Sequence, residues 1–217
     1  MKGSSRLIWS EFSEALHKRM ARPLPGLAAH RRLVPPERRP DLGKAFPKER
    51  KVAAVLALLY PKNERVCCAL IRRPSYPGVH GGQIAFPGGQ VESEDRDLLH
   101  TALREAWEEV GIQAEKVERP IELTRLYIPP SRYEVVPFLG LSHQRPDFIL
   151  QASEVDKLIE LPLEELLAPK FCGEATVETT RGVLNVPAYR WREEIIWGAT
   201  AMIVAEISDL LNDVLSA

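Results

Sequence analysis

The sequence has no surplus of either charge, no long apolar run and few cysteines. Its 29 Lys and Arg residues balance 30 Asp and Glu residues, so it lacks the basic surplus of proteins that bind nucleic acid or anionic membranes. No apolar run approaches the roughly 20 residues that span a bilayer. The three cysteines form neither a disulfide framework nor a metal-binding spacing, and we expect buried, inert thiols. These features predict a cytoplasmic protein with no nucleic-acid or membrane partner.

The chain does contain enough apolar sequence for a sizeable core, 45% of its 217 residues. Residues 1–22 are predicted to form a helix, because their apolar residues recur near helical spacing. Six prolines within residues 23–47 predict an extended arm without regular structure. We therefore expect an N-terminal helix and proline-rich arm over residues 1–48, and a main domain over residues 49–217. The position of the arm is compatible with a strap in a homodimer.

The main domain shows strands and helices that are interspersed without regular strand–helix–strand repeats. This pattern favours a mixed α/β fold. The predicted strands are 52–60, 66–71, 121–128 and 134–141, a hairpin of 177–180 and 183–189 follows, and the helical segments are 97–110, 163–167 and 197–211.

The helix predicted at residues 97–110 carries Glu105, Glu108 and Glu109 within an arc of about 100°, beside its apolar stripe. Carboxylates held so close repel one another. A hard cation such as Mg²⁺ would remove this repulsion, and it is commonly shared with substrate phosphates. Crowding also raises carboxylate pKa values, which prepares one group as a general base. An acidic face also occurs on ordinary solvated helices, where Arg104 would make a salt bridge, so the metal interpretation depends on the flanking sequence.

Two glycines, Gly88 and Gly89, precede this helix in a Phe-Pro-Gly-Gly-Gln segment. Glycine permits the close approach of a ligand, so their backbone groups could contact a metal ion or a phosphate. A plain strand-to-helix turn is the alternative.

Together, Gly89, Asp95 and residues 104–112 (REAWEEVGI) resemble the Nudix box. The family pattern is Gly, five residues, Glu, seven residues, then Arg-Glu-apolar-any-Glu-Glu-any-Gly-apolar. Residues 104–112 match every specified position. The first half departs, since Asp95 replaces glutamate and eight residues separate it from Arg104. The resemblance implies a Nudix-type α/β/α sandwich with a mixed sheet.

In this departure, the sequence resembles the coenzyme A pyrophosphatase branch of that family. This branch has an upstream signature that resembles residues 70–75 (LIRRPS) and 80–89 (HGGQIAFPGG), and it tends to carry an aspartate followed by Thr-Ala-Leu-Arg-Glu, as at residues 101–105. The resemblance implies metal-dependent cleavage of coenzyme A, or a derivative, to 4′-phosphopantetheine and adenosine 3′,5′-bisphosphate.

The resemblance also implies roles for individual residues. Glu105, Glu108 and Glu109 would ligate Mg²⁺ or Mn²⁺, and Arg104 would orient these carboxylates. The candidate substrate-binding residues are Arg72, Arg73, His80, Gly88 and Gly89. Neighbouring strand residues face opposite ways, so at most one of Arg72 and Arg73 should face the substrate. The candidates to bind the ribose 3′-phosphate are Arg72, Arg73, Arg125 and Arg132, without ranking.

Three other interpretations stay open. The Nudix box alone does not separate coenzyme A from ADP-ribose, a dinucleoside polyphosphate or a nucleoside triphosphate. A non-catalytic Nudix-fold binding module would be expected to lose carboxylates that this chain retains. An unrelated interaction protein with an acidic helix would make the glycine segment a coincidence.

Overall fold

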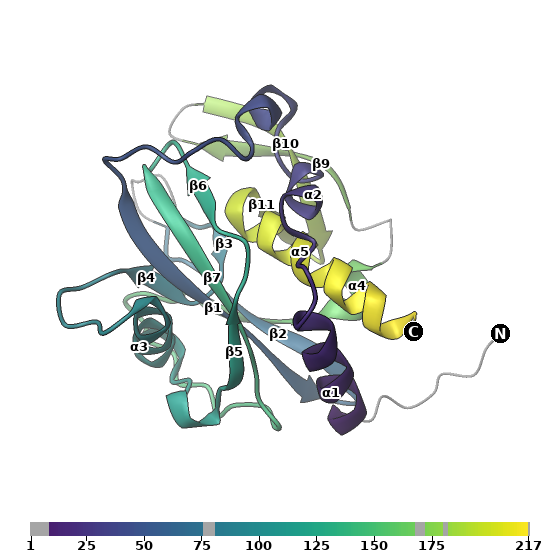
Figure 1. Cartoon of the computed structure of the whole chain (residues 1–217). Helices are drawn as coiled ribbons and strands as arrows, with labels where there is room; N and C mark the ends of the chain where they lie inside the picture. Colours follow the sequence, from purple (N-terminus) through teal and green to yellow (C-terminus); the bar gives the residue numbers. More distant parts are fainter. Residues whose placement is uncertain (1–8, 76–80, 168–171, 180–181, 217) are drawn as a thin grey trace.

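The computed structural model describes residues 9–75, 81–167, 172–179 and 182–216. It has a mixed α/β fold, as predicted, with one large mixed sheet and a smaller one (Figure 1). No helix in these ranges is long and apolar enough to cross a membrane. The strands are β1 Lys51–Lys62, β2 Arg65–Arg72, β3 Ile84–Ala85, β4 Gly88–Gln90, β5 Glu118–Glu122, β6 Leu126–Ile128, β7 Tyr133–Leu141, β8 Lys157–Pro162, β9 Cys172–Thr179, β10 Gly182–Trp191 and β11 Glu194–Trp197. The helices are α1 Trp9–Met20, α2 Gly26–Arg31, α3 Leu98–Val110, α4 Leu163–Leu166, α5 Gly198–Leu215 and the 3₁₀ helices η1 Pro36–Asp41 and η2 Ala114–Lys116.

The large sheet is built around β1, which pairs in parallel with β7 and antiparallel with β2 and β4. The side chains of β1 alternate between two cores, as the two-residue repeat of a strand requires. Leu56 and Leu58 face a cluster with Ala102 and Ala106 of α3. Leu59 faces the opposite cluster, which contains α5. Because both faces are covered, β1 is an almost continuous apolar run in the sequence.

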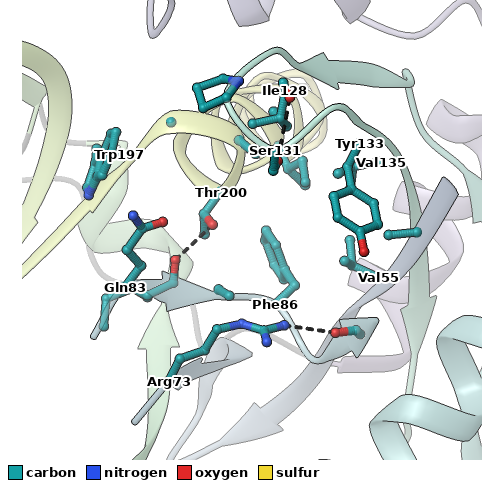
Figure 2. Close-up of a pocket in the computed structure, with 18 of the residues that line it drawn as sticks. Val55, Arg73, Gln83, Phe86, Ile128, Ser131, Tyr133, Val135, Trp197 and Thr200 are labelled. Carbon is teal, nitrogen blue, oxygen red and sulfur yellow. Dashed lines mark hydrogen bonds between the residues drawn. The ribbon is translucent and has the colours of Figure 1, made fainter. Parts of the chain in front are cut away.

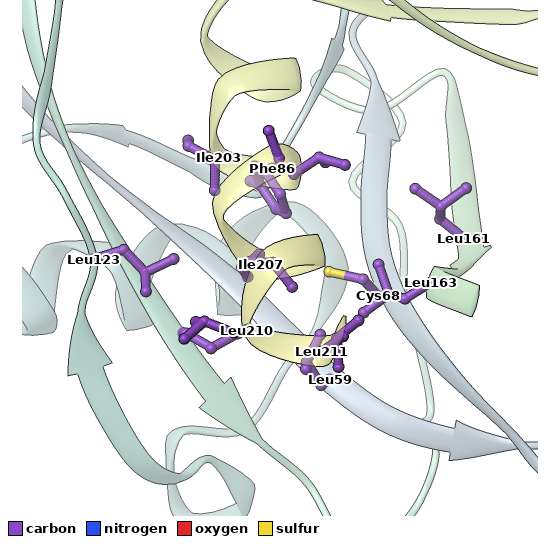
Figure 3. Packing of buried hydrophobic residues seen from close by; sticks show 14 of the residues in the cluster. Leu59, Cys68, Phe86, Leu123, Leu161, Leu163, Ile203, Ile207, Leu210 and Leu211 are labelled. Carbon is purple, nitrogen blue, oxygen red and sulfur yellow. The ribbon is translucent and has the colours of Figure 1, made fainter. Parts of the chain in front are cut away.

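Helix α5 is the main apolar support of the second face. Figure 3 shows Ile207 and Leu211 of α5 beside Leu59 and Cys68 of the sheet. Helix α1 joins the same cluster through buried residues that include Leu16. The sheet therefore lies between α3 on one side and α5 with α1 on the other (Figure 1).

The prediction of an irregular arm was wrong, because the arm contains α2 and η1. Pro25 immediately precedes α2 and Pro36 occupies the first turn of η1, whereas Pro40 lies inside η1. The fixed φ of proline suits a first helical turn, where its missing N–H is not needed. Leu33 and Val34, between the two helices, are buried in the same core as α5.

Two other expectations were wrong in detail. The single strand predicted at 121–128 is interrupted between β5 and β6, because the backbone N–H of Thr124 donates to the Glu206 carboxylate instead of a neighbouring strand. Cys67 and Cys68 are buried as expected, but Cys172, at the first position of β9, is exposed. The hairpin predicted around Gly182 is confirmed as β9 and β10.

A buried pair of hydrogen-bonded side chains fixes α2 to α5. His30 Nε2 lies 3.0 Å from Glu206 Oε2, and neither side chain is accessible to solvent. Thr124 Oγ1 donates to the same carboxylate over 2.7 Å. Burial works to raise the pKa of Glu206, but these hydrogen bonds outweigh it and hold the pKa below its usual value. The folded state therefore keeps a buried carboxylate that depends on its partners.

We expect His30→Ala to lower the free energy of unfolding by about 3–5 kcal/mol, because it leaves this carboxylate without its main partner. Arg32→Ala is the matched control. Arg32 binds Asp209 at the surface between the same two helices, at 2.7 Å, and an exposed pair contributes only about 0–1 kcal/mol. Urea unfolding of both variants measures the difference, and equal losses would contradict the role given to the buried pair.

Candidate active site

The first two residues of β4, Gly88 and Gly89, lie between β1 and α3, where a side chain would clash. A Cβ atom at Gly88 would lie 2.4 Å from the Ala54 carbonyl oxygen, and the φ of Gly88 is +152°. A Cβ atom at Gly89 would lie 2.4 Å from the carboxylate of Glu105. The absence of side chains at these two positions therefore brings the β4 backbone against the acidic face of α3.

Glu109 is the most buried of the predicted ligands, with 2% of its surface exposed. Its carboxylate accepts a hydrogen bond from the Gly88 N–H over 2.8 Å. Arg73 Nη2 lies 3.8 Å from the same carboxylate and donates to the Gly88 carbonyl oxygen over 2.9 Å. Burial raises the pKa of Glu109 to about 7, although Arg73 and the Gly88 N–H oppose the shift.

Glu105 and Glu108 differ in their surroundings. Burial is also the main cause that raises the pKa of Glu105, and its negative neighbours, Glu108 among them, add to the shift. Glu108 is about half exposed and accepts from Arg104 over 3.1 Å. The three predicted glutamates are therefore graded from a buried position at Glu109 to a solvated one at Glu108.

Arg104 connects the helix to Asp95, the residue at which the Nudix box departs from its pattern. Two of its nitrogens donate to the Asp95 carboxylate over 3.0 and 2.9 Å, and Nη1 donates to Glu105 over 3.0 Å. Asp95 also accepts from Thr101 and from the Glu92 backbone N–H. The Arg104 guanidinium is the main cause that holds the pKa of Asp95 well below its usual range. The additional residue between Asp95 and Arg104 therefore does not prevent their contact.

The carboxylates fit a hard divalent cation in chemistry. The charge of Glu105 contributes to the raised pKa of Glu109, and oxygen ligands are those that Mg²⁺ prefers. In the described part of the chain, no three acidic, histidine or cysteine side chains are already gathered around a single point. Glu105 and Glu108 both accept hydrogen bonds from Nη1 of Arg104.

Glu154 is a nearby carboxylate that the sequence analysis did not single out. It lies on the exposed loop before β8, and its charge contributes to the raised pKa of both Glu105 and Glu109. The loop is fixed near the end of α3, because Gln151 N–H donates to the Glu109 carbonyl over 3.0 Å. No motif marks Glu154, and only the folded structure brings it towards α3.

A cavity of about 540 Å³ adjoins β4 (Figure 2). Arg73, Gly88 and Gly89 all line it, and their role in substrate binding stays a prediction. Apart from Arg73, Glu37 and Arg38, the described lining residues are apolar or neutral polar, and they come mainly from β1, β6, β7, the residues around β3 and the junction of β11 with α5. They include Val55, Gln83, Phe86, Ile128, Ser131, Tyr133, Val135, Trp197 and Thr200.

The other predicted substrate residues lie elsewhere. Arg72 donates to Asp156 over 2.8 Å, and Arg125 pairs with Glu122 and Glu134. Neither they nor Arg132 are among the described residues that line the cavity. Of the two neighbouring arginines, Arg73 is therefore the one that faces the cavity. His80 lies outside the described residues.

The raised pKa of Glu109 predicts a pH-dependent stability in metal-free protein. The unfolded chain releases this proton near pH 4.5, whereas the folded state keeps it to about pH 7. The stabilisation is complete below pH 4.5 and is lost as the pH rises to 7. With chelator present, raising the pH from 4.5 to 8 should lower the free energy of unfolding of wild type by roughly 2–4 kcal/mol relative to that of Glu109→Gln. Urea unfolding at both pH values measures this, and a pH-independent difference would contradict it.

Comparisons with known proteins place the sequence in a family. A model of the NUDIX domain matches residues 50–177. A protein from Yersinia enterocolitica described as uncharacterized Nudix hydrolase NudL is 37% identical over 145 residues, covering 66% of this chain and 73% of that protein. Its namesake from Pectobacterium atrosepticum is 33% identical over 148 residues, covering 66% and 74%.

Among solved structures, a MutT/nudix family protein from Enterococcus faecalis aligns with a TM-score of 0.53 at 14% identity, covering 87% of this chain and 78% of the other. This likeness concerns the fold alone. The residues that match the family model include β4, α3 and all three glutamates. The chain belongs to the Nudix family.

Proposed function

We propose that this Nudix hydrolase uses Mg²⁺ or Mn²⁺ to cleave the diphosphate of coenzyme A or its derivatives. The family acts on nucleoside diphosphate derivatives and generally needs divalent metal ions. The observation that carries the proposal is that two carboxylates, the buried Glu109 and the partly buried Glu105, lie against the backbone of Gly88 and Gly89, which line the cavity. Two neighbouring carboxylates against a strand that lines a cavity favour a cation and a phosphorylated ligand.

Each residue near β4 has a distinct part in this reaction. Glu105, Glu108 and Glu109 would hold the metal ion, with a backbone carbonyl of Gly88 or Gly89 as a further ligand. When bound, the ion would neutralise charge that develops on the diphosphate oxygens. Arg104 keeps the carboxylates in position through its bonds to Asp95 and Glu105.

Arg73 is placed to grip the diphosphate. Its guanidinium reaches the Gly88 carbonyl oxygen and the edge of the cavity, and such groups bind phosphate oxygens through paired hydrogen bonds. Water would attack one phosphorus while Glu105, Glu109 or Glu154 accepts its proton.

The upstream segments 70–75 and 80–89 favour coenzyme A within the family, and the cavity volume is in the range of nucleotide-sized ligands. The products would be 4′-phosphopantetheine and adenosine 3′,5′-bisphosphate.

A substrate panel tests the proposal. Purified protein with Mg²⁺ or Mn²⁺ is incubated with coenzyme A, ADP-ribose, a dinucleoside polyphosphate and nucleoside triphosphates, and the products are separated by chromatography. We expect coenzyme A to be cleaved with the highest kcat/KM and chelator to abolish turnover. Cleavage of another substrate with coenzyme A untouched would reject the substrate but keep the reaction class.

A further inference from the structure

The N-terminal segment forms one wall of the cavity. Pro35, Glu37 and Arg38, at and within η1, line it together with Arg73 and β4. These residues precede the part of the chain that matches the NUDIX domain model, residues 50–177. The residues that match the NUDIX domain therefore form one side of the cavity, and the N-terminal segment forms another.

This wall is fixed to the body of the protein. The buried His30–Glu206 pair and the Arg32–Asp209 ion pair both join the segment to α5. After α2, Leu33 is fully buried in the core. The first turns of α5 line the same cavity through residues that include Thr200, whose Oγ1 donates to the Ile84 carbonyl oxygen over 2.9 Å. One helix therefore both anchors the segment and forms the neighbouring wall.

Two cationic side chains line the cavity, and they come from different elements. Among the described lining residues, Arg38 and Arg73 are the only ones with a positive charge. Arg73 lies beside Gly88 and Glu109, where the reaction is proposed to occur. The segment with Arg38 lies towards the end of the molecule that carries β10, away from α3 (Figure 1). A ligand that uses both arginines must carry two separated anionic groups.

We infer that Arg38 binds a second phosphate of the substrate, remote from the scissile diphosphate, and so determines substrate specificity. This inference rests on the proposed function, in which that group is the ribose 3′-phosphate of coenzyme A. Glu37 lines the same wall, so this wall is not a generally basic surface. Attraction of an anion there therefore depends on the Arg38 guanidinium. A guanidinium binds a phosphate dianion through paired, charge-assisted hydrogen bonds.

Product binding tests this inference without requiring turnover. Isothermal titration compares adenosine 3′,5′-bisphosphate with adenosine 5′-monophosphate, which lacks the 3′-phosphate, in the presence of Mg²⁺. Wild type should bind the bisphosphate about 10–100-fold more tightly. In Arg38→Ala and in Arg38→Gln, the affinities for the two ligands should differ from each other by no more than about threefold. Arg38→Lys should keep part of the preference for the bisphosphate.

Arg31→Ala is the matched control, because Arg31 is exposed on the same segment and does not line the cavity. It should keep the wild-type preference. Equal affinities in wild type, or an unchanged preference in both Arg38→Ala and Arg38→Gln, would overturn the inference, as would an equal loss for both ligands. The substrate panel separates the two claims: a wild type that ignores coenzyme A but prefers the 3′-phosphate would reject the function and retain Arg38 as the specificity residue.

Discussion

Replacing Glu109 with glutamine is expected to lower kcat for the diphosphate substrate by about 10²–10⁴-fold. The amide keeps the size of the side chain but removes a negative charge that would hold the metal ion or accept the proton of the attacking water. Because Glu109 is buried, its neutral replacement should not destabilise the fold. Steady-state kinetics with Mg²⁺, together with a urea unfolding curve, measure both effects.

Glu115→Gln is the control for this variant. Glu115 is an exposed carboxylate in η2, shortly after α3, and its replacement should leave kcat and KM unchanged. Full activity in Glu109→Gln would remove Glu109 from the metal site. An equal loss in both variants would indicate a general effect of charge on the protein instead of a specific ligand.

The two glycines of β4 should respond differently to alanine. At Gly89 the added Cβ meets the end of a flexible side chain, the Glu105 carboxylate, at 2.4 Å. Gly89→Ala should therefore fold but displace that carboxylate, with a loss of about 10²-fold or more in kcat/KM. At Gly88 the Cβ meets the backbone of β1, and the positive φ adds strain. Gly88→Ala should lower the free energy of unfolding by about 2–4 kcal/mol as well as activity.

Gly173→Ala gives a matched reference, since nothing lies within 4 Å of a Cβ atom at that position. Thermal unfolding and kcat/KM of the three variants together test the close packing of β4 against β1 and α3. Wild-type activity in Gly89→Ala would show that the Glu105 position is not critical. Wild-type stability in Gly88→Ala would show that β4 can move away from β1 at little cost.

Local signals explain why α3 could be predicted closely from the sequence. Asp97 accepts a hydrogen bond from the His100 N–H at the first turn, and Gly111 ends the helix with a φ of +74°. Between them, the apolar stripe has helical spacing, and Ala102, Ala106 and Val110 are buried. Capping and periodicity are both encoded within a few residues, so neither depends on the rest of the fold.

Elements that depend on distant partners could not be predicted in the same way. Strand β4 has only three residues, two of them glycine, and exists because β1 and α3 enclose it. Strand β8 was also not predicted, and it takes its place through pairing with β2, far away in the sequence. Helix α2 forms in this proline-rich stretch with the support of α5, through the His30–Glu206 pair and the buried Ala29.

The residues of the candidate site also divide into those marked by local sequence and those brought together only by the fold. The glutamates of α3 and the two glycines could be named from the motif, since the helix and the strand are near each other in the sequence. The choice of Arg73 over Arg72 required the three-dimensional position of each side chain. Arg38 and Glu154 come from segments without a recognisable motif, and only the folded structure brings Arg38 to the cavity and Glu154 towards the glutamates.

Direct titration of Mn²⁺, followed by the electron paramagnetic resonance of the free ion, tests the central claim that the acidic face of α3 with β4 binds the metal ion. Wild type should bind Mn²⁺, Glu105→Gln and Glu109→Gln should weaken its affinity about 10–100-fold, and Glu115→Gln should not change it. Unchanged Mn²⁺ affinity in both Glu105→Gln and Glu109→Gln would contradict the account.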